Sequence, residues 1–176
     1  WNFFATCGSG PFLKDRLFSL DRGVLVPMPE DALPQQDDLT FYETQRTALT
    51  QHVIRFMRGE APGSVLVTGG PGSGKTTLVL SLVKELPEVR LVMTDPKNAE
   101  GLPGLCRELQ RQPLRFLLYV DAMALPSPEY DRLRGDLQCG RLGGDNLLLC
   151  ISARAGDDSV FHQRVHLGVP TLKEFI

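Results

Sequence analysis

Short apolar runs alternate along this chain with stretches in which apolar residues recur at helical spacing. Four runs, at 64–68, 89–93, 115–120 and 146–152, are almost uninterrupted, and 165–169 is a weaker fifth. Strands that are apolar on both faces and alternate with helices are typical of a parallel sheet with helices on its two sides. The pattern predicts an α/β protein, a three-layer α/β/α sandwich with a mainly parallel five-stranded sheet.

The intervening stretches carry the signals that begin and end helices. Residues 40–43, Thr-Phe-Tyr-Glu, form a capping box, and the helix that they open is expected to end near Arg58. A second helix follows the glycine-rich segment at 69–74, and a third covers about 102–109. Ser127-Pro128 is typical of an N-cap and a first helical residue, so a fourth helix is expected to begin there.

Residues 1–38 lack a long periodic pattern and are rich in glycine, proline and short polar runs. Pro27, Pro29 and Pro34 favour extended backbone, and we expect an arm that lies on the domain surface. The predicted organisation is an N-terminal arm over 1–38 and a core domain over 39–176. Because the chain begins with Trp rather than Met, we expect it to be part of a longer protein.

The segment from Gly69 to Thr76 carries the most specific chemistry in the chain. It has four free positions between two glycines, followed by lysine and a hydroxyl residue, and it joins an expected strand to an expected helix. In such a phosphate loop the glycines let successive backbone N–H groups face anionic oxygens at the positive end of the helix. We expect phosphates to bind at Gly70, Pro71, Gly72, Ser73, Gly74, Lys75, Thr76 and Thr77.

Two further roles follow from this motif, and both point to ATP with Mg²⁺. Lys75 is expected to reach the β- and γ-phosphates, and the Thr76 hydroxyl to complete the coordination of Mg²⁺. Asp121 follows the apolar run at 115–120, where a second metal-binding carboxylate is expected at the tip of a strand. Ligands bind at the carboxyl edge of such sheets, so Thr76 and Asp121 are the predicted metal ligands and residues 39–176 a nucleotide-binding core.

Composition narrows the possible partners. The 176 residues are 42% hydrophobic and 23% charged, as in an ordinary single globular domain. A net charge of −2 gives no indication of a nucleic-acid or membrane surface. We find no signal peptide and no run long enough to span a membrane.

The four cysteines, Cys7, Cys106, Cys139 and Cys150, form no C-x-x-C pair. Three of them lie in apolar or helical patterns, which predicts buried, reduced thiols and a cytoplasmic location.

Around Asp121, which follows the apolar run at 115–120, the chain resembles the AAA+ superfamily of P-loop ATPases. It is most similar to a family of uncharacterised bacterial AAA-type ATPases that is classed as a domain of unknown function. The resemblance covers about 39–154, and the flanking matches are 39–45, 56–59, 90–92 and 113–116. It implies ATP hydrolysis, a helical lid, and a homo-oligomer or a protein partner. The lid would follow Pro170, and essentially none of it is present.

Two positions depart from what this resemblance implies. The metal-binding aspartate of AAA+ proteins is followed by an acid that activates the attacking water, and here that position is Ala122. A polar sensor, often asparagine, usually ends the fourth strand, and here Ala153 occupies that place beside Ser152. Arg164 stands where many AAA+ proteins carry an arginine finger, a catalytic residue that reaches a neighbour's γ-phosphate. Glu129, in the first turn of an expected helix, is a weaker candidate for the missing acid.

Mg²⁺-dependent ATP binding with slow or impaired hydrolysis is therefore the predicted function, and the domain would act as a nucleotide-dependent switch. The catalytic candidates are Lys75, Asp121 and Arg164. An alternative is a working ATPase of the loader or remodelling type that takes its acid or finger from a lid or a partner subunit. A small-molecule kinase is a third possibility. No Asn-Lys-x-Asp motif is present, which favours adenine over guanine.

Overall fold

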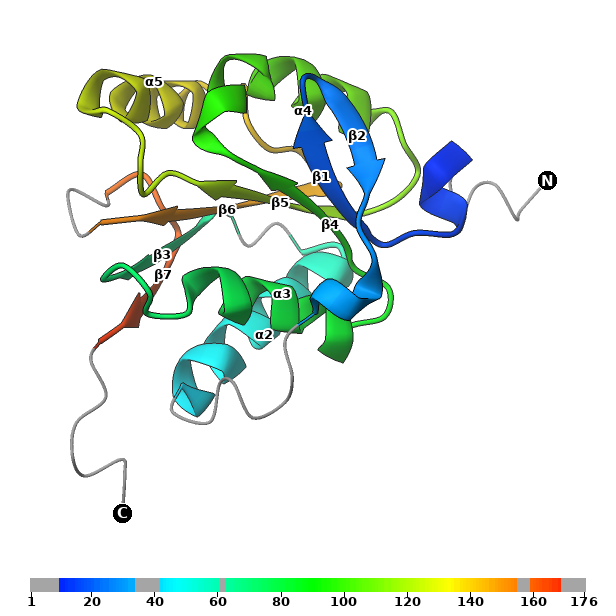
Figure 1. Ribbon diagram of the computed structural model, residues 1–176, viewed down its shortest axis with the longest axis horizontal. Coiled ribbons are helices and arrows are strands. Elements are labelled where there is room, and N and C mark those ends of the chain that lie inside the picture. The colour runs from blue at the N-terminus through cyan, green and yellow to red at the C-terminus, as the bar shows by residue number, and fades with distance from the viewer. Residues whose placement is uncertain (1–9, 34–41, 61–62, 155–158, 169–176) are drawn as a thin grey trace.

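A seven-stranded sheet forms the centre of the computed structural model, which describes residues 10–33, 42–60, 63–154 and 159–168 (Figure 1). The strand order is β2-β1-β4-β5-β6-β3-β7. Every neighbouring pair is parallel except β1 and β2. The strands are β1 (Leu17–Asp21), β2 (Val24–Pro27), β3 (Val65–Gly69), β4 (Arg90–Thr94), β5 (Phe116–Asp121), β6 (Leu147–Ala153) and β7 (Gln163–Leu167). The predicted α/β class and mainly parallel sheet are confirmed.

Helices cover both faces of this sheet (Figure 1). The α-helices are α2 (Glu43–Met57), α3 (Lys75–Glu85), α4 (Leu102–Gln110) and α5 (Ser127–Gln138). Short 3₁₀ segments are η1 (Gly10–Leu13), η2 (Glu30–Ala32) and η4 (Pro96–Gly101). None of the helices within the described residues is long and apolar enough to cross a membrane. The N-cap of α5 is Pro126 rather than Ser127, one residue earlier than predicted.

The strands β1 and β2 correct the expectation of a surface arm for residues 17–27. They form a hairpin that turns at Arg22 and Gly23, both with positive φ, and β1 pairs in parallel with β4, Leu17 lying opposite Leu91. Leu17 and Phe18 are fully buried, on opposite faces of the sheet. Because β1 is only five residues long and buries Leu17 and Phe18 on opposite faces, it shows no periodic pattern in the sequence. The sheet therefore has seven strands rather than five.

Two predictions at the domain boundary fall outside the described residues. The boundary at residue 38 and the capping-box residue Thr40 both lie there, and α2 begins at Glu43 with Tyr42 at its N-cap. The expected position of a helical lid, after Pro170, also lies outside them. The fifth predicted strand, at 165–169, corresponds to β7 at Gln163–Leu167. β7 lies at the edge of the sheet, and from Arg164 on its residues alternate between exposed and buried.

The core consists of two apolar clusters, one on each face of the sheet. Alternate residues of β5 enter each of them, so Leu118 faces α4 and α5 whereas Tyr119 faces α2 and α3. A strand buried in this way on both sides reads as a continuous apolar run. Its carboxyl end brings Asp121 to the same edge of the sheet as the ends of β3 and β6.

The cysteines only partly follow prediction. Cys106 and Cys150 are buried free thiols inside the two clusters, whereas Cys139 is exposed at the C-cap of α5. The helical pattern around Cys139 ends one residue before it, which is why it does not reach the core. Cys7 lies outside the described residues.

Candidate nucleotide-binding site

The predicted phosphate loop joins β3 to α3, with three of its glycines in conformations that other residues rarely adopt. Gly72 has a φ of 73°, and Gly74, the N-cap of α3, has a φ of 87°. At Gly69 an added Cβ would lie 2.5 Å from Ser73 Oγ and 2.7 Å from the Leu167 carbonyl oxygen, so only glycine fits. The loop is therefore closed against β7 on one side and opens at the carboxyl edge of the sheet.

Lys75 folds back onto this loop. Its Nζ donates to the carbonyl oxygens of Gly69 at 3.0 Å and Gly70 at 2.7 Å, and to Ser73 Oγ at 3.2 Å. Burial lowers the pKa of Lys75, and the nearby Asp121 carboxylate partly opposes this shift. A phosphate entering the loop would compete with these neutral oxygens for the ammonium, and a charged acceptor makes the stronger hydrogen bond.

A cavity of about 490 Å³ lies over the loop. Its walls are Pro71, Gly72, Ser73, Gly74, Lys75, Thr76, Thr77, Asp121, Met123, Ala124 and Arg154. The structure thus brings Asp121 together with every predicted phosphate-binding residue except Gly70, which belongs to the loop but does not line the cavity. Arg154 was not predicted as part of the site. It reaches the cavity because β6 ends one residue earlier, beside the phosphate loop.

A group of hydroxyls beneath the cavity connects the two predicted metal ligands. Thr76 Oγ1 lies 3.1 Å from the Tyr119 hydroxyl, and Ser152 Oγ donates to Asp121 Oδ1 at 2.8 Å. Burial raises the pKa of Tyr119 to about 12, and the neighbouring hydroxyls of Ser152 and Thr76 partly oppose this shift. Tyr119 was missed in the sequence, although a tyrosine in a buried strand usually needs a polar partner, and residues two apart share a face with each other.

Arg164 does not line this cavity. It lies in β7 opposite Leu66, three residues before Leu167, which pairs with Gly69 at the loop. Its side chain is exposed. A role for Arg164 toward a neighbouring molecule stays a prediction, whereas the arginine that lines the cavity is Arg154.

Residues 15–143 match the model of a family described as "Protein of unknown function (DUF815)". The chain belongs to this family. The DUF815 chain is also 28% identical over 126 residues to the Holliday junction branch migration complex subunit RuvB of Streptomyces griseus, a match that covers 69% of this chain and 35% of that protein. The curated relative is thus much longer than the segment it shares.

Solved structures show the same fold. The RuvB Holliday junction branch migration motor of Thermotoga maritima superimposes with a TM-score of 0.55 at 20% identity, over 81% of this chain and 50% of that one. Cdc6p of Pyrobaculum aerophilum gives 0.56 at 16% identity, over 80% and 49%. The DUF815 chain therefore has the fold of an AAA+ P-loop ATPase domain and spans about half the length of these proteins.

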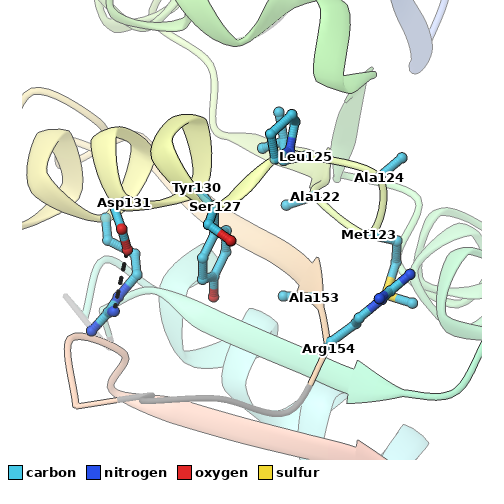
Figure 2. A pocket seen from close by; sticks show the side chains of 11 residues that line it. Ala122, Met123, Ala124, Leu125, Ser127, Tyr130, Asp131, Ala153 and Arg154 are labelled. Carbon is cyan, nitrogen blue, oxygen red and sulfur yellow. Dashed lines mark ion pairs between the residues drawn. The ribbon is translucent and has the colours of Figure 1, made fainter.

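A second cavity, of about 480 Å³, adjoins the first in the DUF815 domain. Met123, Ala124 and Arg154 line both cavities. Ala122 and Ala153, the two departures noted in the sequence, are buried in its wall and present only methyl groups to it (Figure 2). The one carboxylate in this lining, Asp131, pairs with Arg134 at 3.9 Å (Figure 2). Glu129 is exposed and is not part of the lining.

Proposed function

We propose that this protein binds ATP with Mg²⁺ at the phosphate loop, hydrolyses it slowly, and acts as a nucleotide-dependent switch. The observation that carries the proposal is the intact loop beside Ala122. Residues Gly72 to Thr77 would hold the phosphates, with Lys75 as the charged donor. Hydroxyl and carboxylate oxygens of Thr76 and Asp121 are the hard ligands that Mg²⁺ prefers.

The bound cation would supply charge neutralisation at the β- and γ-phosphates. The chain's own residues bind and orient the nucleotide, and within the described lining of the two cavities no carboxylate is left over to take a proton from water. In the lining of the two cavities the carboxylates are Asp121, held by Ser152 and the Met123 N–H, and Asp131, held by Arg134. Losing a general base slows a reaction by about 10²–10⁴-fold, so hydrolysis is expected to be slow.

The switch would act through the residues that line both cavities. Met123, Ala124 and Arg154 border the phosphate site on one side and the second cavity on the other. A γ-phosphate that attracts Arg154 would therefore change the shape of the second cavity, and its loss would release that side chain. Segments ordered by a γ-phosphate and released without it are a common form of nucleotide switch.

A single-turnover experiment with γ-labelled ATP, Mg²⁺ and excess protein tests this proposal. Bound and hydrolysed nucleotide are followed in the same samples, with Lys75→Met as the control in which binding should be much weaker. Tight binding with the label retained on ATP supports the proposal. Release of phosphate at about 1 s⁻¹, within the normal range of enzymes, would mean that another group acts as the base.

The second candidate is an active ATPase of the loader or remodelling type, completed by a lid or by another subunit of a homo-oligomer or complex. The cavity of about 480 Å³ beside Ala122 and Ala153 favours it, because it leaves room for a side chain from elsewhere. The test measures hydrolysis by this chain over a range of protein concentrations and with added partner subunits: hydrolysis that appears only on association would support completion. Location in the cytoplasm stays a prediction.

A further inference from the structure

Four side chains from three elements form a row of oxygens under the nucleotide cavity, with one hydrogen bond at each end of the row. Thr76 begins α3, Tyr119 and Asp121 lie on one face of β5, and Ser152 lies opposite Asp121 in β6. Tyr119 and Ser152 are 1% and 0% exposed, so their hydroxyls have only protein groups as partners. Thr76 and Asp121, at the two ends of the row, are also the ones that line the cavity.

The chemistry of the groups favours one direction for the hydrogen bonds. An ionised carboxylate only accepts, so Ser152 gives its single proton to Asp121 Oδ1, at 2.8 Å. Toward Tyr119, Ser152 Oγ can then only accept. A Tyr119 hydroxyl that turns its proton toward Ser152 accepts in turn from Thr76 Oγ1, at 3.1 Å.

This direction matters for the two ends of the row. The Thr76 proton points to Tyr119, which leaves the lone pairs of Thr76 Oγ1 for a cation in the cavity. Both hydrogen bonds to Asp121, from Ser152 Oγ and from the Met123 N–H, end on Oδ1. Within the part of the chain that the structure describes, no bond reaches Oδ2, which is therefore available on the cavity side.

We propose that Tyr119 and Ser152 are positioning residues for a divalent cation, a buried hydroxyl relay that orients the oxygens of Thr76 and Asp121 before the cation arrives. The proposal rests on the proposed Mg²⁺-dependent nucleotide binding and adds the residues that tune its metal dependence. Without the relay, the Thr76 hydroxyl rotates freely and presents its proton to the cavity for part of the time. The cation then has to reorient its ligand as it binds.

The test is a titration of Mg²⁺ into wild type and variants that hold a fluorescent ATP analogue, with a second titration of the analogue in EDTA. Tyr119→Phe keeps the ring and removes the link, and Ser152→Ala removes it one step further along. Each is expected to raise the half-saturating Mg²⁺ concentration about three- to tenfold, the scale of one hydrogen bond. Affinity in EDTA should stay within about twofold of wild type, because the relay does not touch phosphate.

Tyr42→Phe is the matched control. The Tyr42 hydroxyl donates to the Gly168 carbonyl oxygen at 2.9 Å, so this variant loses a hydroxyl in the same chemical way outside the relay. Its Mg²⁺ dependence should equal that of wild type. Thr76→Val removes the ligand itself and gives the upper limit of the effect.

Two outcomes would overturn the relay. In one, Tyr119→Phe and Ser152→Ala fold and bind with unchanged Mg²⁺ dependence; should Tyr119→Phe not fold, Ser152→Ala decides alone. In the other, Tyr42→Phe shifts the Mg²⁺ dependence as much as the relay variants do, so that the effect is only structural. Failure of the proposed function looks different, since wild type itself would then bind no analogue with Mg²⁺ or with EDTA.

Discussion

The ammonium of Lys75 donates to the carbonyl oxygen of Gly70 at 2.7 Å, so the charge expected to meet phosphate is held by the loop itself. Binding of ATP must exchange this neutral acceptor for an anionic one. The gain in binding free energy comes from the charge of the new acceptor, because the number of acceptors around the ammonium need not change.

Lys75→Met is expected to lower ATP affinity about 100-fold, the scale of one or two hydrogen bonds to a charged group. The fold should persist, since methionine keeps the length of the side chain. Isothermal titration calorimetry with ATP and Mg²⁺ measures the effect, and circular dichroism checks the fold. Undiminished affinity would remove Lys75 from the site.

The lowered pKa of Lys75 should make both ATP affinity and the free energy of unfolding depend on pH, in opposite directions. ATP affinity is expected to fall as pH rises through that pKa, below the ordinary value of 10.5, because the ammonium is lost. The unfolded chain still binds the proton over this interval, so the contribution of Lys75 to the free energy of unfolding of the ligand-free protein rises there with pH. Urea unfolding and ATP titration across alkaline pH should show these opposite trends, both reduced in Lys75→Met.

Ala122→Glu tests whether hydrolysis is slow for lack of a base. The new carboxylate would face the second cavity next to Asp121 and could accept a proton from water. Phosphate release should rise by at least about tenfold, toward the 10²–10⁴-fold worth of a general base. Ala122→Gln, which has the same length but cannot take a proton from water, is the control and should leave the rate unchanged.

Gly69→Ala should destabilise the protein through the contact with β7. Its Cβ would meet the Leu167 carbonyl oxygen at 2.7 Å, at a φ of 157°, and strain of this kind costs about 1–3 kcal/mol. The neighbouring Gly70→Ala is the control for stability, because a Cβ there has nothing within 4 Å. Thermal unfolding of the two variants should differ, and equal midpoints would mean that the loop yields easily.

The two arginines should differ in their effect on nucleotide. Arg154→Gln removes a charge that lines the phosphate cavity and is expected to weaken ATP binding roughly threefold to tenfold. Arg164→Gln changes an exposed side chain opposite Leu66 and should leave binding by a single molecule unchanged. If Arg164→Gln weakens ATP binding only at high protein concentration, the result would instead support contact of Arg164 with a neighbouring copy.

The sequence predicted the phosphate loop and the central strands because both are local signals. Glycine spacing defines the loop from Gly69 to Thr76, and β5 reads as a strand because both of its faces are buried. The hairpin was missed since the burial of Phe18 depends on pairing with a strand far along the chain, and no local pattern encodes that contact. Tyr119 was within reach of sequence reasoning, whereas its bond to Thr76 needed the relative placement of α3 and β5.

The last described strand ends beside the phosphate loop. Leu167 lies opposite Gly69, and the next residue, Gly168, accepts a hydrogen bond from Tyr42 at the start of α2. A change in the shape of the phosphate loop therefore reaches the point where the chain leaves the sheet through a single residue pair. The direction in which the chain leaves β7 is therefore set next to the phosphate loop.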